Sequence, residues 1–309
     1  MSGHVSGDDA ILPFQIADTA VRGRVVRLAG SIDEILSAHQ FPDAVSELVG
    51  EAACLTAMMG AALKFDGKLI FQAQGKGPVS LVVADYTAGG ALRAMAKHGA
   101  LEDAGAGKAV IGDLIGKGHV AMTIDQGPDM ERYQGVTPIE GDNLAAAAVA
   151  YFDQSEQIPT LVKLAVGRLS APGQPDQWRA GGLMAQFVPG EGGLRERGEE
   201  VVMNADDRET WERASAFVET VQADELLDPS ISAETLLYRL FHEEGVRVFD
   251  SQTVRAECGC NGDKIATVLE RYGEDDLADM VDGDAIKVTC EFCRKEYQFS
   301  PSGEMINAS

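Results

Sequence analysis

Four of the five cysteines lie in one C-terminal stretch, "CGCNGDKIATVLERYGEDDLADMVDGDAIKVTCEFC", and this clustering constrains the fold more than any other feature of the chain. They form a Cys-x-Cys pair, Cys258 with Cys260, and a Cys-x-x-Cys pair, Cys290 with Cys293. Thiolates are soft ligands, and four of them suit the tetrahedral coordination that zinc prefers. The spacing therefore predicts one zinc ion per chain in a closed site, without the open position that a catalytic zinc keeps for water.

The residues around these pairs predict a small zinc module. The stretch 264–273 is expected to be a helix that ends at Gly273, and 285–290 and 294–300 are expected to be strands beside the second pair. A module of about 50 residues has too little core to fold easily alone, and a structural zinc contributes on the order of 10 kcal/mol to folding. Because an oxidant can convert each close pair into a disulfide and so remove the ligands, the site is either structural only or both structural and a switch.

The strongly acidic composition argues against nucleic acid as a partner. The 309 residues include 49 acidic and 26 basic side chains, a formal net charge of -23, which repels phosphate backbones and anionic membranes. No run of about 18 apolar residues predicts a membrane span, and the polar start "MSGHVSGDDA" lacks the apolar core of a signal peptide. We therefore expect a cytoplasmic protein, in whose reducing surroundings clustered thiols bind metal or act in redox chemistry.

The first 190 residues predict an α+β fold, a mixed α/β domain with a largely antiparallel sheet. Apolar runs separated by turn residues predict hairpins, and apolar residues at helical spacing predict helices. The long helix is apolar nearly all round, so its Cys54 is expected to be buried as a small hydrophobe. The predicted strands are 23–30, 68–74, 78–86, 118–125, 131–138 and 181–189, and the predicted helices are 41–65 and 141–160.

Beyond Pro189 the composition becomes rich in glycine and charge, as in a linker, and two short amphipathic helices follow. Asp206 with Glu209 is expected to form the capping box of the first helix, and Ser232 is expected to cap the second. Both helices are short and acidic, so each needs a surface on which to bury its apolar side. Their apolar residues include Trp211, Phe217, Leu236, Leu240 and Phe241.

The chain lacks the motifs of an enzyme. No phosphate-binding Gly-x-x-x-x-Gly-Lys-Ser/Thr occurs, and the glycines of "GKGPVS" and "GKGHV" predict turns. Asp153 and Glu156 have no histidine at a catalytic spacing, so they are expected at an exposed helix end. A hydrolase or transferase that carries the zinc module as an accessory is therefore a weaker hypothesis than a non-enzymatic protein.

Several segments together resemble the redox-regulated heat-shock protein 33 chaperones, over essentially the full length of the chain. One departure is "NGDK" after Cys260, where many members carry a Ser-Arg-Glu-like run; it concerns the start of the expected helix and not the ligands. The matching segments are "GKGPVS" (75–80), "YQGVTP" (133–138), "YFDQSEQIPT" (151–160), "GGLMAQ" (181–186), "LLYRLFHEEGVRVFD" (236–250) and "VTCEFCRKEYQFS" (288–300), with the cysteine pattern.

The resemblance implies a holdase chaperone that works without ATP and is inactive while reduced and zinc-bound. Its parts would be an N-terminal core over 1–190, a metastable helical linker over 191–257 and a zinc-binding redox switch over 258–309. Hypochlorite, or peroxide with heat, would form two disulfides, release zinc and unfold the linker. The activated form would be a homodimer that binds unfolding client proteins.

By position, the resemblance implies that the oxidised pairs are Cys258 with Cys260 and Cys290 with Cys293. A zinc-ribbon interaction or regulatory protein with a purely structural zinc is the alternative. The two helices directly before the thiols favour the switch, because they are positioned to respond when the module unfolds. The linker residues expected to pack before oxidation and to contact clients after it are Trp211, Phe217, Leu236, Leu240 and Phe241.

Overall fold

The computed structural model describes residues 7–63, 66–101, 110–127, 130–170, 172–173, 175–189 and 203–308. The chain divides into two compact units, Met1–Ala256 and Glu257–Ser309. Both contain antiparallel sheets and helices, which confirms the predicted α+β class. Most of the glycine-rich and charged stretch after Pro189 lies outside the described residues.

One sheet of the first unit is apolar on both faces. Its strands run in the order β10-β1-β2-β9-β8, with β11 also paired to β1, and every pairing is antiparallel. Along β2, Val25 points to one face and Val26 to the other, and both are buried. The strands are β1 (Ala10–Ile16), β2 (Val21–Leu28), β8 (Thr160–Leu169), β9 (Gln177–Phe187), β10 (Val246–Val248) and β11 (Gln252–Thr253).

The second sheet of this unit runs in the order β12-β5-β4-β3-β6-β7. Its pairings are antiparallel except that of β12 with β5, which is parallel. The strands are β3 (Lys68–Gly75), β4 (Val79–Thr87), β5 (Ala91–His98), β6 (Gly118–Asp125), β7 (Tyr133–Pro138) and β12 (Arg255–Ala256).

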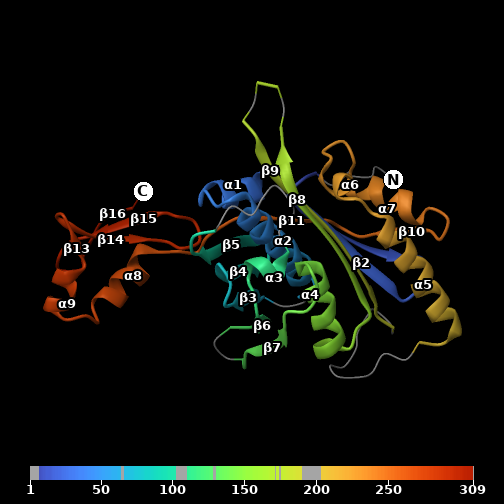
Figure 1. Cartoon of the computed structure of the whole chain (residues 1–309), viewed down its shortest axis with the longest axis horizontal. Helices are drawn as coiled ribbons and strands as arrows, with labels where there is room; N and C mark the ends of the chain where they lie inside the picture. The colour runs from blue at the N-terminus through green and yellow to red at the C-terminus, as the bar shows by residue number, and fades with distance from the viewer. Residues whose placement is uncertain are drawn as a thin grey trace. The chain divides into compact units, whose positions relative to one another are not determined.

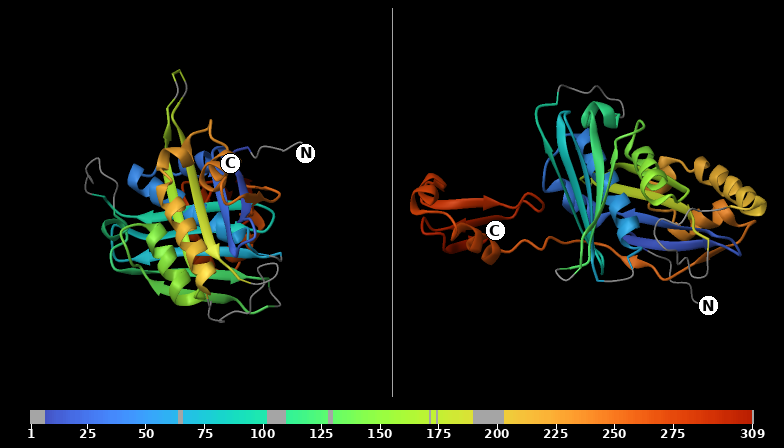
Figure 2. Two further views of the ribbon diagram at one scale, coloured as in Figure 1. Left: turned by 90° about the vertical axis from the view of Figure 1, so that its right-hand side faces the viewer. Right: turned by 90° about the horizontal axis from the view of Figure 1, so that it is seen from below.

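Helix α2 (Asp43–Gly60) packs between the two sheets and forms the centre of the main core (Figures 1 and 2). It is apolar nearly all round, as a helix buried on all sides must be. Cys54 lies within it and is fully buried, which confirms the prediction from sequence. Burial also raises the pKa of this thiol far above its usual value, so it stays protonated.

The shorter helices of this part border the core. The side chain of Asn143 accepts a hydrogen bond from the amide of Ala146 and so begins α4. Among the described residues, no helix is both long and apolar enough to cross a bilayer. The helices are α1 (Gly30–Ser37), α3 (Ile111–Leu114), α4 (Leu144–Tyr151) and the π-helical turn η1 (Phe152–Glu156).

Three helices cover the other apolar face of the first sheet: α5 (Ala205–Thr220), α6 (Ala223–Leu227) and α7 (Ala233–Phe241) (Figure 1). The ring of Phe241 lies 5.8 Å from that of Phe14 in β1 and 6.1 Å from that of Phe217 in α5. Burying a large apolar side chain contributes about 1.5–3 kcal/mol, so the covered face holds these helices in place.

Two buried arginines fix the end of α6 on the sheet. Arg179 in β9 donates from Nε to the carbonyl of Leu227 at 2.8 Å, and Arg27 in β2 donates to the carbonyl of Asp228 at 2.5 Å. Both guanidinium groups also pair with Asp8, at 2.6 Å from Arg179 and 3.4 Å from Arg27. Gly181 allows the close approach, because a Cβ there would lie 2.5 Å from the carbonyl oxygen of Leu226.

After α7 the chain is bound to both sheets in turn. β10 and β11 pair with β1, and β12 pairs with β5. Between them, the buried Val254 donates its amide to the carbonyl of Asp9 at 2.7 Å. The segment between the helices and the first cysteine is therefore anchored by backbone hydrogen bonds.

The second unit is a small antiparallel sheet with two helices. Its strands run in the order β13-β14-β15-β16. The elements are α8 (Gly262–Leu269), α9 (Glu274–Asp279), β13 (Val281–Asp282), β14 (Ala285–Thr289), β15 (Glu296–Phe299) and β16 (Met305–Ala308).

Two expectations about helix ends are wrong. The capping box of α5 uses Asn204 and Asp207, not Asp206 and Glu209, because the helix begins earlier than the apolar spacing suggested. Gly273 is the N-cap of α9 and not the end of α8, because the chain starts a second acidic helix there. The predicted cap at Ser232 is confirmed, since its side chain accepts from the amide of Thr235.

Replacing Arg179 with methionine should loosen α6 without changing the shape of the core greatly. The carbonyl of Leu227 would lose its donor, and an unsatisfied buried acceptor lowers stability by about 1–3 kcal/mol. Urea unfolding and limited proteolysis within 203–244 would measure the change. The control is Arg213→Met, which removes an exposed pair with Glu209 on α5 and should alter stability by less than about 0.5 kcal/mol. Equal protease resistance of both variants would contradict the role given to Arg179.

Candidate metal centre

The two cysteine pairs sit on two loops of the second unit. Cys258 and Cys260 lie in the loop before α8, whose first turn is fixed by the Asn261 side chain accepting from the amide of Asp263 at 2.8 Å. Cys290 follows β14 and Cys293 lies in the turn that leads to β15. Both loops are short and braced by regular structure, so the four thiols are held in defined places.

The turn that carries the second pair is closed by its own backbone. The amide of Cys290 donates to the carbonyl of Lys295 at 2.9 Å, and the amide of Arg294 donates to the carbonyl of Cys290 at 3.0 Å. Arg294 adopts the left-handed conformation with φ of 61°. This tight reversal brings both thiols of the turn to the same side.

The four sulfur atoms form one cluster. Cys258 Sγ lies 3.7 Å from Cys290 Sγ, and Cys260 Sγ lies 3.4 Å from Cys293 Sγ. All four ligand atoms lie within 4.8 Å of one another. Zinc bound to sulfur at about 2.3 Å in a tetrahedron would separate the sulfurs by about 3.8 Å. The donor set and its spacing therefore fit a single tetrahedral zinc ion.

A tyrosine completes the surroundings of the cluster. The hydroxyl of Tyr297 in β15 donates to Cys260 Sγ at 3.1 Å. Burial alone would raise the pKa of Cys260, but this hydrogen bond and those from the other three thiols outweigh it and lower the pKa. Burial raises the pKa of Cys293 to about 12, and the bond to Cys260 raises the pKa of Tyr297. Negative charge is therefore favoured at Cys260, where the hydrogen bonds converge.

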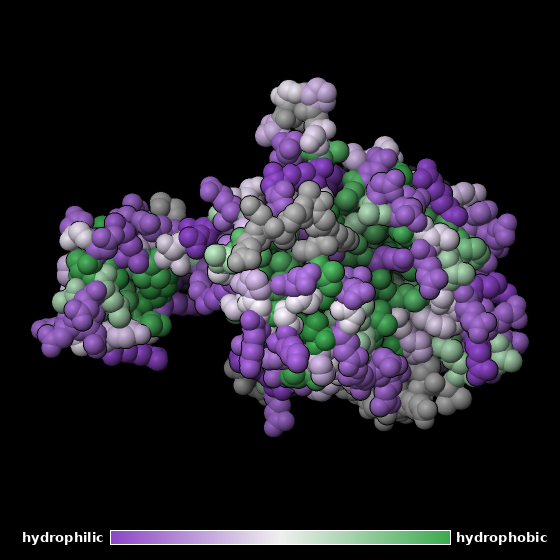
Figure 3. All heavy atoms as spheres, viewed as in Figure 1, coloured by the Kyte–Doolittle hydropathy of each residue, from purple (hydrophilic) through white to green (hydrophobic). Residues whose placement is uncertain are grey.

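The core beneath the cluster is small. A domain of this size rarely gains more than about 3–5 kcal/mol from a single apolar core. Figure 3 shows apolar side chains at the surface of this unit, and Val268, Met305 and Ile306 are each about half exposed. The stability of the unit therefore depends on groups other than its core. The buried core residues are Leu269, Leu277, Ile286, Tyr297 and Phe299.

The linker residues predicted from sequence lie against the first sheet. Leu236 and Phe241 are fully buried there, whereas Trp211, Phe217 and Leu240 are partly buried at the edge of the same cluster. The ring of Trp211 meets that of Phe187 edge-on at 6.5 Å. Sequence reasoning did not find Arg27, Arg179 or Tyr297, because their partners lie far away in the sequence and an isolated Arg or Tyr carries no spacing signal.

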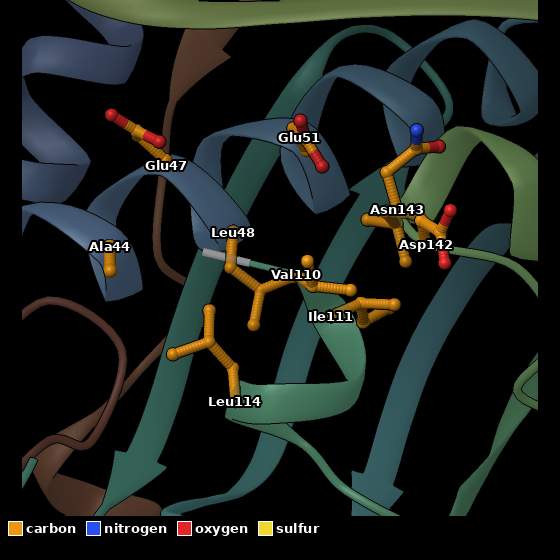
Figure 4. A pocket seen from close by; sticks show the side chains of 10 residues that line it. Ala44, Glu47, Leu48, Glu51, Val110, Ile111, Leu114, Asp142 and Asn143 are labelled. Atoms are coloured by element: carbon orange, nitrogen blue, oxygen red, sulfur yellow. The ribbon is translucent and has the colours of Figure 1, made fainter. Parts of the chain in front are cut away.

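The first unit contains a small pocket with carboxylates around it. It holds about 210 Å³ between α2 and α3, and Figure 4 shows Glu47, Glu51 and Asp142 at its rim. The floor is apolar, with Leu48 and Ile111 among the residues that line it. Its lining residues include no serine, cysteine, histidine or lysine, so it offers no Ser–His or Cys–His pair and no lysine nucleophile.

Comparison with known proteins decides the family. The Hsp33 protein family matches residues 9–300 of the chain. A 33 kDa chaperonin of Caulobacter vibrioides is 46% identical over 301 residues, which cover 96% of both chains. The chain belongs to the Hsp33 family. This is a family of chaperones and not of enzymes, as the sequence predicted.

More distant Hsp33 relatives agree in length and fold. A 33 kDa chaperonin of Methylobacillus flagellatus is 33% identical over 293 residues, covering 94% of this chain and 91% of its own. The crystal structure of the Thermotoga maritima 33 kDa chaperonin, a heat shock protein 33 homolog, superposes with a TM-score of 0.78. At 21% identity and 96% coverage of both chains, this match shows the shared fold.

Replacing Cys290 with serine should weaken zinc binding sharply, because a hydroxyl is a far poorer ligand for zinc than a thiolate. Zinc would be measured per chain after dialysis against a mild chelator under reducing conditions, and the fold of 257–308 by proteolysis. The control is Cys54→Ala, which alters a buried thiol of the first unit and should retain zinc fully. Full zinc content and unchanged protease resistance in Cys290→Ser would contradict the assignment of this ligand.

Proposed function

We propose that the chain is a redox-regulated holdase chaperone that binds unfolding proteins without ATP in the cytoplasm. The thiol cluster carries the proposal, because four sulfurs within 4.8 Å of one another suit both metal binding and disulfide formation. The proposed parts are a core (1–190), a helical linker (191–257) and a zinc-binding switch (258–309). The family resemblance and the covered apolar face support this division.

In the proposed resting state the thiols of Cys258, Cys260, Cys290 and Cys293 hold one zinc ion. When bound, zinc keeps four thiolates together and supplies stability of a size that the small core cannot, on the order of 10 kcal/mol. Tyr297 steadies one ligand through its hydrogen bond to Cys260. A purely structural zinc is the competing function, and a closed shell of four thiolates is compatible with it.

Oxidation then removes the ligands. Two thiolates that form one disulfide lose two electrons, and one hypochlorite accepts them with one water to give one chloride and two hydroxides. The proposed disulfides join Cys258 to Cys260 and Cys290 to Cys293, after which the unit no longer holds its ion. All four sulfurs are within reach of one another, so the pairing rests on the family resemblance, and peptide mapping of the oxidised chain would test it.

Unfolding of the switch would next release the linker. α5 and α6 carry more acidic than basic side chains. The three helices are held on the sheet by Phe241, Leu236 and their neighbours and by the two arginines. Once they leave, Leu12, Phe14 and Phe187 on the sheet become available to a client. Newly exposed apolar surface also favours the proposed homodimer.

The oxidant experiment tests the switch. The reduced, zinc-loaded chain would be treated with hypochlorite, or with peroxide at raised temperature, and followed by zinc release, thiol count and light scattering of a heat-denatured client. We expect scattering to fall only after oxidation and to be restored by a thiol reductant. Suppression that is equal before and after oxidation would favour a structural zinc, and no suppression in any state would exclude the holdase.

A single change in the linker should bypass the switch. Phe241→Ala removes a fully buried ring from the contact between α7 and the first sheet, and such a truncation lowers stability by about 3–5 kcal/mol. We expect this variant to suppress client scattering while still reduced and zinc-bound. The matched control is Tyr238→Ala on the same helix, where the side chain is 66% exposed. A loosened linker without holdase activity would show that the covered face does not bind clients.

A further inference from the structure

The last strand of the first sheet has an open edge. β8 pairs with β9 on one side and ends the strand order on the other. The amide of Phe187 donates to the carbonyl of Pro159, so odd-numbered residues of β8 direct their backbone groups to β9. Thr160, Val162 and Leu164 therefore direct theirs outward, and no described residue forms a backbone hydrogen bond with that side.

A groove runs along this edge. It holds about 690 Å³ and is walled by α4 on one side and α5 on the other, which lie on either side of β8 in Figure 1. The α4 wall includes Ala145, Ala146, Val149 and Ala150, whose small side chains leave room beside the strand. The opposite wall is formed by Trp211 and Val218. An apolar groove beside unpaired strand groups is the geometry in which an extended peptide adds a strand.

The edge also lacks the usual protection against such pairing. Edge strands are commonly blocked by bulges, inward charges or a covering element. The register of β8 with β9 is continuous, without a bulge. Lys163 is turned aside, because its ammonium donates to the carbonyl of Glu219 at the end of α5 at 3.1 Å.

The charges around the groove select the ligand. Glu51, Asp153 and Glu219 line it, and Lys163 is its sole basic residue among those described. An acidic rim attracts basic side chains and disfavours acidic ones. A second copy of this chain, with a net charge of -23, would bring another acidic surface to the same rim. The occupant is therefore a basic segment of another protein.

We propose that the β8 edge and this groove bind an extended apolar segment flanked by lysine or arginine residues, as an added strand. Aggregation-prone strands of many proteins carry such flanking charges, which limit their self-association. The groove exists while α5 is docked, so the proposal concerns the reduced chain and goes beyond the client binding proposed for the oxidised chain. The strand from Thr160 to Leu164, at about 3.3 Å per residue, offers about 16 Å for pairing.

The direct test uses the reduced, zinc-loaded full chain and a short fluorescent peptide of valine and isoleucine between paired lysines. Fluorescence anisotropy would measure binding, and hydrogen exchange would report the amides of Val162 and Leu164. We expect binding with protection of both amides, and loss of binding when the backbone of the peptide is N-methylated. Since no oxidation is involved, failure of the redox switch would leave this result unaffected.

Two variants distinguish binding at this site from a general attraction of basic peptides to an acidic chain. Ala150→Leu fills the groove and should weaken binding about tenfold, whereas Ala38→Leu at an exposed position after α1 should not. Asp153→Lys combined with Glu219→Lys should reverse the preference, so that a glutamate-flanked peptide binds better than the lysine-flanked one.

Three results would overturn the proposal. One is absence of peptide binding to a correctly folded chain, judged by circular dichroism and zinc content. Another is binding of the lysine-flanked peptide that protects neither amide and is unchanged in Ala150→Leu, which would mean charge attraction elsewhere. The third is self-association in sedimentation that Ala150→Leu abolishes, which would make a second copy the occupant.

Discussion

The first sheet is apolar on both faces, and the rest of the structure follows from the need to keep water from both. One face is closed permanently by α2, which is buried on every side between the two sheets. The other is closed by α5, α6 and α7, which carry many acidic residues and bury little more than a single stripe each. A cover of this kind is stable only while it is docked, since short helices are marginal in water by themselves.

The first unit has apolar surface that needs a cover, whereas the second unit has too small an apolar core. Its few buried residues contribute little against the entropy lost on ordering the chain, and the four clustered thiols could add stability by holding a metal ion. The two deficiencies complement each other in the proposed function. In that proposal, the second unit depends on reduced thiols and the three helices depend on docking, and the short strands β10, β11 and β12 connect the two along the chain.

The sequence was sufficient for the parts that have a local pattern. The cysteine spacing predicted the cluster, helical periodicity predicted α2, and Ser232 identified the start of α7. The sequence was insufficient for features that depend on contacts between residues far apart in the chain. The role of Arg179 depends on α6 lying against β9, which the sequence does not reveal. The predicted helix over 141–160 ended where β8 begins, and no strand was predicted for 161–169, because the pairing of β8 with β9 is not visible in a single segment. The capping box was misplaced because Asp206, Asp207 and Glu209 all lie near the start of α5, so composition alone did not distinguish them.

The backbone pairing of β10, β11 and β12 affects how fast unfolding of the second unit could reach the helices. Between the thiols and α7, the chain is joined to β5 and then to β1, with the amide of Val254 bonded to Asp9 between them. Under the proposed switch, unfolding starts at Cys258. The backbone hydrogen bonds of β12, β11 and β10 must then break one after another before the helices can unfold. Each step is reversible, so the strands pair again if the thiols are reduced before all three strands have separated. The anchored segment would therefore delay release of the helices. A brief exposure to oxidant would leave them docked, and only a sustained exposure would release them.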